Sequence, residues 1–282
     1  MRGTARIYLI ISIVLFMGIS FANSAEILSG AGATFPQPLY RRWIEIYEKT
    51  SSVRITYDGI GSGGGIRQLL AGKVNFGGTD AFMSDEEMAA APGKILHMPT
   101  CLGAVVLTYN LPGSPALRFS PEVVAGIFLG EITKWSDPAI VKLNPGLRQS
   151  TLDITVVHRS DSSGTSFIFT DYLSKISSQW KKSIGHGKQV NWPAGIGVEK
   201  NPGVVGMIQR IPGSIGYVEL TYAEGQHLPT ASLRNRSGLF VEPTLDAVSE
   251  AATVDLPDDT RILITDTPSP KGYPISAFTW SI

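Results

Sequence analysis

Three clusters of glycine, serine and threonine each separate a strand-like run from an amphipathic helical pattern. They occupy residues 30–36 (GAGATFP), 61–65 (GSGGG) and 159–166 (RSDSSGTS). Serine and threonine before a helix cap its first turn, and glycine permits a tight change of direction. Strand, turn and helix in repeated succession are typical of α/β proteins built from crossover connections. The recurrence therefore predicts an α/β fold in which three helices begin in turns of one kind.

The segments around these turns fit the strands and helices of such a fold. Alternating or continuous apolar residues predict strands in four places, at residues 53–57, 95–107, 154–157 and 215–218. Apolar residues at helical spacing predict helices in three places, at residues 39–46, 66–74 and 169–180. Residues 221–270 are polar and lack clear periodicity, so we expect loops there with one short helix near 245–252.

The first 25 residues have the organisation of a secretory signal peptide. Arg2 and Arg6 precede an apolar run at residues 7–19, and small and polar residues follow. This run of 13 residues is short against the roughly 20 that span a bilayer, which disfavours the alternative of a membrane anchor. We expect cleavage after Ser24 or Ala25, where no cysteine is present to carry a lipid.

Charge and cysteine content narrow the function. Residues 1–25 contain two of the 24 basic residues and none of the 24 acidic ones, so the exported chain carries a net charge of −2. Such a chain has no basic surplus for binding nucleic acid. The single cysteine, Cys101, cannot form an internal disulfide and is expected to be a small buried hydrophobe. The four histidines lack ligand spacing, so no metal or cofactor is predicted.

The three turns together point to an anion. Each places backbone N–H groups without a helical partner at the positive end of a helix dipole, with hydroxyl groups beside them. Helix starts of this kind hold anions without needing a net positive protein. Taken singly, the first turn could be only a cap, the second a flexible linker and the third a polar loop. Their recurrence favours one shared oxyanion site.

Two charged residues in the third turn support that interpretation. Arg159 can present a planar fork of N–H donors to an oxyanion. Asp161, two residues further on, is placed to hold that guanidinium in position. The alternative is an ordinary surface ion pair, which would contribute little.

Asp80 indicates which oxyanion is bound. A carboxylate that faces an anion repels it unless the anion has a proton to donate. Phosphate keeps such a proton at neutral pH, whereas sulfate does not. Asp80 would then accept the phosphate proton and reject sulfate, because an unpaired buried carboxylate against a dianion is costly. The alternative is that Asp80 caps a helix over residues 85–88 or lies in a loop.

Longer motifs contain the three turns. They read GAGATFP at 30–36, GIGSGGG at 59–65, WSDPAI at 135–140, LNPGL at 143–147, DSSGTSF at 161–167 and RIPGSIGYV at 210–218. In sequence and in order these motifs resemble the periplasmic phosphate-binding proteins of ABC phosphate importers. The similarity extends from about residue 28 to residue 275, which is nearly the whole exported chain.

This resemblance implies a two-domain periplasmic-binding-protein fold of type II, with the ligand in a cleft between the domains. It implies a first domain of residues 26–110 together with 271–282, and a second domain of residues 111–270. The implied phosphate-binding residues are Thr34, Phe35, Ser62, Asp80, Arg159, Ser163, Gly164 and Thr165. In this set Asp80 accepts the phosphate proton and Asp161 orients Arg159.

Two features of the sequence depart from the family pattern. His158 stands where the family often has another basic residue, and we expect no effect on binding. Family members also continue past the strand expected near residues 276–282 with helical segments that cover the first domain. The resemblance therefore implies a C-terminally shortened first domain whose apolar sheet surface is left uncovered.

The resemblance also implies a place and a partner. The chain is expected to be a monomer in the periplasm that binds inorganic phosphate and delivers it to permease subunits at the inner membrane. Neither an enzymatic activity nor a nucleic-acid partner is expected.

Three alternatives remain open. A receptor for sulfate or molybdate would use the same turns, although Asp80 argues against it. A phosphatase or serine hydrolase would need a nucleophile with a base. Ser163 does not lie in the G-x-S-x-G elbow, and no P-loop lysine follows residues 61–65. A surface protein that merely kept the fold is the third alternative.

Overall fold

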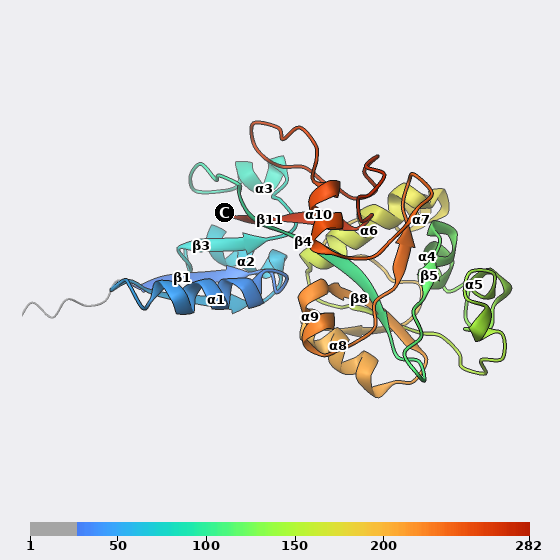
Figure 1. Ribbon diagram of the computed structural model, residues 1–282. Coiled ribbons are helices and arrows are strands. Elements are labelled where there is room, and N and C mark those ends of the chain that lie inside the picture. Colours follow the sequence, from blue (N-terminus) through green and yellow to red (C-terminus); the bar gives the residue numbers. More distant parts are fainter. Residues whose placement is uncertain (1–26) are drawn as a thin grey trace, which may run out of the picture.

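The computed structural model describes residues 27–282, so the predicted signal peptide and its cleavage site lie outside the described residues. Two lobes make up this part of the chain, and the long strand β4 (Met98–Tyr109) runs between them (Figure 1). Within residues 27–282, no helix is both long and apolar enough to cross a bilayer.

One mixed sheet extends through both lobes. Its strands are β1 (Ile27–Gly32), β2 (Arg54–Gly59), β3 (Phe76–Thr79), β4 (Met98–Tyr109), β6 (Thr155–Arg159), β7 (Ile196–Val198), β8 (Ser214–Glu219) and β11 (Ser276–Ser281). Their order is β2-β1-β3-β11-β4-β8-β6-β7. At one end β1 pairs in parallel with β2 and β3, and at the other end β6 pairs in parallel with β7 and β8. Between these groups, β11 and β4 pair antiparallel with their neighbours.

Helices connect the parallel strands, as parallel pairing requires. The helices are α1 (Gln37–Tyr47), α2 (Ser62–Leu70), α3 (Asp85–Ala89), α4 (Pro121–Phe128), α5 (Pro138–Val141), α6 (Gly164–Ile176), α7 (Ser178–Ser183), α8 (Lys200–Arg210), α9 (Leu220–Gly225) and α10 (Leu245–Ala251), with a 3-10 turn at Pro145–Leu147. A small second sheet contains β5 (Arg118–Phe119), β9 (Ser232–Arg234) and β10 (Phe240–Val241). We call β1–β3 and β11 with α1–α3 the first lobe, and β6–β8 with α4–α9 the second lobe.

Each lobe has its own concentration of buried apolar side chains. The larger cluster fills the second lobe and includes the buried part of β4, where residues 104–107 are fully enclosed, and it reaches Phe35 and Ala277 of the first lobe. The smaller cluster lies in the first lobe around Met83, Phe278 and Trp280. Residues 254–264 also pack into this smaller cluster through Ile264. The division of the domains at residue 271 stays a prediction, and Ile264 packs against the first lobe from the other side of that boundary.

The strands and helices expected from the sequence are present with shifted ends, except that the helix expected at residues 169–180 is divided at Ser177 into α6 and α7. In the polar segment 221–270, α10 at Leu245–Ala251 matches the predicted short helix. The same segment also contains β9 and β10, which its weak periodicity did not predict. Both are two or three residues long, too short for an alternating pattern to register.

The second turn differs from its prediction because α2 begins at Ser62, so Gly63, Gly64 and Gly65 lie inside its first turn and not before it. A Cβ atom at Gly65 would lie 2.5 Å from the backbone oxygen of Ala31. Glycine is therefore needed here because the helix packs directly on the backbone of β1.

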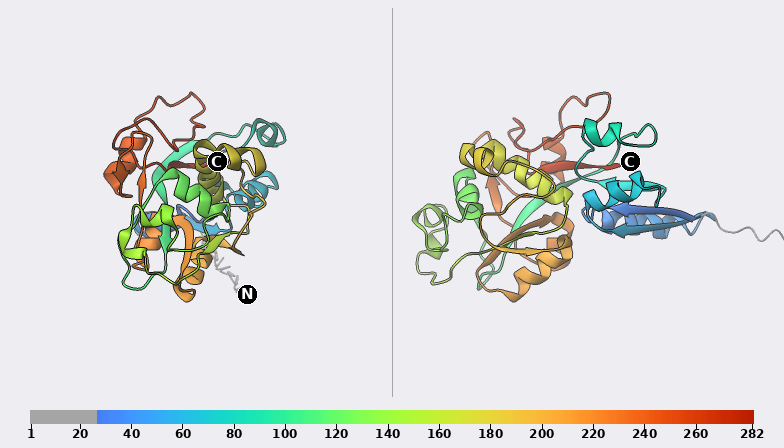
Figure 2. Two further views of the ribbon diagram at one scale, coloured as in Figure 1. Left: turned by 90° about the vertical axis from the view of Figure 1, so that its right-hand side faces the viewer. Right: turned by 180° about the vertical axis from the view of Figure 1, so that it is seen from behind.

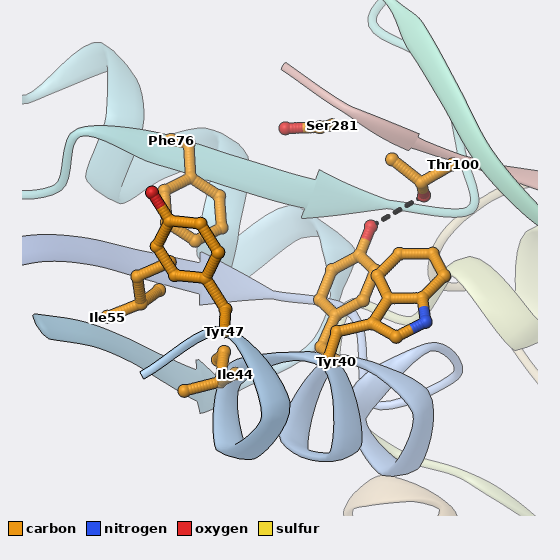
Figure 3. Close-up of a pocket in the computed structure, with 8 residues that line it drawn as sticks. Tyr40, Ile44, Tyr47, Ile55, Phe76, Thr100 and Ser281 are labelled. Carbon is orange, nitrogen blue, oxygen red and sulfur yellow. Dashed lines mark hydrogen bonds between the residues drawn. The ribbon is translucent and has the colours of Figure 1, made fainter. Parts of the chain in front are cut away.

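The helix α1 does not bury the stripe that its periodicity suggested. Leu39, Trp43 and Ile46 are 36, 45 and 50% exposed, and Tyr40 is the buried residue of the helix. Figure 3 shows that Tyr40 and Tyr47 of α1 face the strands, where an apolar groove of about 310 Å³ lies. The apolar face of α1 thus lines an open groove and is not enclosed in the core. Figure 2 shows α1 from behind, at the edge of the first lobe.

Candidate anion-binding site

The three predicted turns meet where the two lobes touch. The second and third turns are joined by a hydrogen bond from the N–H of Gly63 to the backbone oxygen of Ser162 at 3.1 Å. The first and third turns are joined by Asn201, whose Nδ2 lies 2.9 Å from Thr34 Oγ1 and 3.4 Å from Thr165 Oγ1. Turns that are distant from one another in sequence thus form one polar cluster.

Backbone donors in this cluster have no partner. Ser163 is the N-cap of α6, and its Oγ accepts from the N–H of Ser166 at 3.1 Å. Within residues 27–282, the N–H groups of Phe35, Gly164 and Thr165 have no hydrogen-bond acceptor, although all three residues are buried. Buried N–H groups without a partner are rare and costly in proteins. Two of them open α6, where the helix dipole favours negative charge.

Gly164 brings the third turn against the first lobe. A Cβ atom at this position would lie 2.3 Å from Ser62 Oγ and 2.5 Å from Asp80 Oδ2. No side chain can occupy that space without displacing one of the two. The glycine therefore permits the start of α6 to approach both predicted residues of the first lobe.

Arg159 and Asp161 form a buried pair with two parallel hydrogen bonds. Nε of Arg159 lies 2.6 Å from Oδ1 of Asp161, and Nη2 lies 2.5 Å from Oδ2. The side chains are 1 and 14% exposed, so the alternative of a surface ion pair is wrong. Although burial raises the pKa of Asp161, the hydrogen bonds and charge of Arg159 hold it below its ordinary value. Nη1 points instead to Thr165 Oγ1, at 3.4 Å. Asp161 thus fixes one edge of the Arg159 guanidinium, and the other edge is available to donate to a ligand.

Asp80 is a buried acceptor. It is 1% exposed, and its Oδ1 accepts from Thr279 Oγ1 at 2.8 Å. Burial raises the pKa of Asp80 to about 7, and hydrogen bonds from Thr279 and Ser62 together with the charge of Arg159 partly offset that effect. The alternative that Asp80 caps α3 is wrong, because Ser84 caps that helix in a capping box with Glu87.

The hydroxyl groups around Asp80 are set up as donors. Ser62 Oγ accepts from the N–H of Asp80 at 3.2 Å and also bonds the Asp80 carboxyl group. The hydroxyls of Thr34 and Thr165 accept from Asn201, so their own protons are free to donate elsewhere. The cluster therefore combines several donors with Asp80 as an acceptor, which suits a protonated oxyanion.

Sequence comparison places the chain among known proteins. The sequence model of the PBP superfamily domain matches residues 20–282. The phosphate-binding protein PstS of Pasteurella multocida is 45% identical over 241 residues, which are 85% of this chain and 70% of that protein. The chain belongs to the PstS family of phosphate-binding proteins. A second family member, PstS of Haemophilus influenzae, is 40% identical over 94% of this chain and 80% of its own length.

Solved structures show the same fold at lower sequence identity. The phosphate-binding protein of Stenotrophomonas maltophilia aligns with a TM-score of 0.66 and 23% identity, over 91% of this chain and 78% of that one. The two-domain fold of periplasmic binding proteins, expected from the motifs, is therefore confirmed.

All eight candidate ligand residues of this PstS-family chain lie in or beside the polar cluster, together with Asp161. Sequence reasoning missed Asn201, which lies in the first turn of α8, and Thr279, which lies in β11. Asparagine at a helix start is usually a cap, and threonine in a strand is usual because it is β-branched. Neither residue therefore gave a signal that distinguished it from an ordinary structural position.

No metal-binding cluster of histidine, cysteine and carboxylate side chains occurs within residues 27–282. Cys101 is half-buried in β4, less enclosed than predicted, and burial raises its pKa to about 12. His158 stacks on Trp192, with ring centroids 4.9 Å apart, and its ring bonds the backbone oxygen of Arg159. These contacts give His158 a packing role.

Proposed function

We propose that this chain is a receptor that binds inorganic phosphate between its two domains and delivers it to an ABC-type importer. One arrangement carries the proposal, namely free N–H donors and the buried Arg159 opposite the buried acceptor Asp80. The names of the PstS relatives support phosphate as the ligand. They describe binding proteins, which favours a receptor over a phosphatase or hydrolase.

The proposed ligand shell follows from the geometry of the cluster. Backbone N–H groups of Phe35, Gly164 and Thr165 donate to phosphate oxygens, and Arg159 donates through its free edge. Hydroxyl donors complete the shell from the three turns, at Thr34, Ser62, Ser163 and Thr165. Asp161 orients Arg159.

Asp80 provides the proposed choice between anions. A phosphate that keeps a proton donates it to the Asp80 carboxylate, whereas sulfate has no proton to offer. Sulfate would leave the carboxylate facing negative charge inside a buried site, where water cannot screen the repulsion. The receptor for sulfate or molybdate, considered above as an alternative, is therefore disfavoured.

Contacts between the lobes support a ligand-gated closure. Besides the bonds of Gly63 and Asn201, the Tyr222 hydroxyl donates to the backbone oxygen of Thr34 at 2.6 Å. Phe82 of the first lobe packs edge-on against Phe167 of the second. A ligand that contacts both lobes shifts the equilibrium toward this closed arrangement. We propose domain bounds of 26–110 with 271–282, and 111–270.

The proposed setting is the periplasm, reached through a signal peptide cleaved near residue 25. There the closed monomer would present itself to the permease subunits of the importer. The remaining alternative, a surface protein on the same fold, predicts a folded chain without phosphate affinity.

Calorimetric titration of the purified chain tests the proposal. Phosphate should bind with one site per chain, and sulfate should not bind under the same conditions. Asp80→Asn should lose the preference for phosphate over sulfate. A folded protein without phosphate binding would refute the proposed function, and equal binding of both anions by the parent would refute the role of Asp80.

A further inference from the structure

The Asp80 carboxylate has a dedicated partner on the strand β11. Thr279 Oγ1 lies 2.8 Å from Asp80 Oδ1, although the two residues are 199 positions apart in sequence. Thr279 is fully buried and Asp80 is 1% exposed, so water does not compete for this bond. An ionised carboxylate can only accept, so the threonine hydroxyl donates its single proton to Oδ1.

A β-bulge fixes the position of Thr279. In the pairing of β11 with β4, Thr279 is opposite Cys101 and Trp280 is opposite Pro99, so Thr100 is the extra residue. Bulges of this kind re-aim side chains beside functional sites. The hydroxyl of Thr100 donates to the backbone oxygen of Thr279 at 3.1 Å and bonds the Tyr40 hydroxyl at 2.7 Å, as Figure 3 shows for the second bond. The bulge is thus tied to α1.

The hydrogen bond leaves the two carboxylate oxygens with different surroundings. Oδ1 is occupied by Thr279, whereas Oδ2 is the oxygen that faces the start of α6, 2.5 Å from where a Cβ of Gly164 would be. Rotation of the carboxylate would break the bond to Thr279. The bond therefore keeps Oδ2 directed at the cluster of anion donors.

We propose that Thr279 is a positioning residue that holds Asp80 as a one-sided acceptor and thereby sets the preference for a protonated anion. This inference rests on the proposed phosphate-binding function. Thr279 itself does not contact the anion and acts through Asp80.

The charge state of Asp80 gives a second reason for the role. Burial raises its pKa to about 7, and the bond from Thr279 lowers it. Without that bond, more Asp80 is protonated at neutral pH and cannot accept a proton from the ligand. The charged and titratable groups that also act on Asp80 or sense it are Arg159, Glu219, Cys101, Tyr40, Tyr57 and Tyr222. Of these, Glu219 also has a pKa raised by burial to about 7.

Two substitutions at Thr279 separate the effect of its hydroxyl group from the effect of its side-chain shape. Thr279→Val keeps the shape and removes the donor, and Thr279→Ser keeps the donor. Thr108→Val is the matched control, because Thr108 is a fully buried threonine of β4 whose hydroxyl has no partner within residues 27–282. Glu219→Gln removes the other carboxyl group that titrates near neutral pH.

Calorimetry with phosphate and sulfate across the range of about pH 6 to 9 gives the first readout. Near neutral pH, Thr279→Val should bind phosphate about tenfold more weakly than the parent, since more of its Asp80 is protonated and the carboxylate is no longer held toward the anion. The loss should shrink toward high pH, where Asp80 ionises again. Dividing the dissociation constant of each variant by that of the parent at the same pH cancels the titration of phosphate itself. Thr279→Ser and Thr108→Val should bind phosphate as tightly as the parent across the range, and Thr279→Val should show the same relative loss on the Glu219→Gln background.

Carboxyl NMR of the ligand-free chain gives the second readout. The pKa of Asp80 should rise in Thr279→Val and return in Thr279→Ser. An unchanged Asp80 titration in Thr279→Val would overturn the inference, as would equal losses of affinity in the valine and serine variants. If the parent binds no phosphate, the proposed function fails, while the ligand-free titration still decides whether Thr279 controls Asp80.

Discussion

The Nζ atom of Lys188 lies 2.5 Å from Oε1 of Glu87, and this ion pair joins the two lobes. Glu87 lies in α3 of the first lobe, and Lys188 follows α7 of the second. The backbone oxygen of Lys188 also accepts from the N–H of Ser163 at 2.8 Å. The ion pair is therefore connected directly to the N-cap of α6, at the edge of the proposed anion site.

Glu87→Gln should weaken phosphate binding by about twofold at low salt, because partly exposed ion pairs contribute under about 1 kcal/mol. Glutamine at this position keeps the capping box of α3, so only the charge is lost. The difference from the parent should disappear at high salt. Arg234→Met, which breaks the pair between β9 and Glu122 of α4, serves as the control. Calorimetry at two salt concentrations measures the affinity, and a loss of phosphate affinity that does not depend on salt would contradict the prediction.

Gly164→Ala should reduce phosphate affinity by about tenfold or more, since overpacking a tight contact costs about 1–3 kcal/mol. The new Cβ would meet Ser62 Oγ and Asp80 Oδ2 at 2.3 and 2.5 Å and push the lobes apart. Gly206→Ala in α8 is the matched control, because its Cβ would meet nothing within 4 Å. That control should raise the free energy of unfolding by about 0.5–1 kcal/mol and leave affinity unchanged. Equal affinities for Gly164→Ala and the parent would show that the start of α6 does not form the site.

Asn201→Asp should weaken phosphate binding by at least about tenfold, because a donor amide is replaced by a charge that repels the anion. The aspartate keeps an oxygen for the N–H of Glu219, which Asn201 Oδ1 accepts at 3.2 Å. It loses the donor to Thr34 and Thr165. Calorimetry measures the affinity, and thermal unfolding checks that the variant is folded. Retained affinity would mean that the two hydroxyls are oriented without Asn201.

The stability of the ligand-free chain should depend on Asp80 between about pH 4 and pH 7. Burial raises the folded-state pKa of Asp80 to about 7, above the ordinary 3.8. The folded state therefore holds this proton more tightly than the unfolded state. The stabilising contribution is complete below about pH 4 and is lost as the pH rises through about 7.

Urea unfolding of the parent and Asp80→Asn across this range provides the measurement. The parent should lose free energy of unfolding relative to the variant as the pH rises. Glu219, whose pKa is raised to about 7 chiefly by burial and in part by Asp80, remains in both proteins, so its burial effect cancels in the comparison. A constant difference between the two proteins would show that Asp80 does not titrate in this range.

Local sequence patterns predicted the parts of the site that are encoded locally. Each of the three turns combines its strand end, cap and helix start within a few residues, and Arg159 and Asp161 are only two positions apart. Asp80 was inferred from its charge and from the family motifs. Its partner Thr279 depends on a bulge between β4 and β11, which no local pattern encodes. The exposure of the apolar face of α1 could not be predicted from its periodicity either. Apolar residues at helical spacing do not indicate which element, if any, covers them.

The place of β11 in the sheet has a consequence for how the molecule assembles. This strand lies between β3 and β4, whose residues precede it by most of the chain. Pairings between such distant segments close large loops and form slowly. The parallel strands β6–β8 of the second lobe can pair before residues 276–281 are in place, whereas the first lobe cannot complete its sheet and the larger core still lacks Ala277. Selectivity should therefore be acquired last during folding, at the step that brings Thr279 to Asp80.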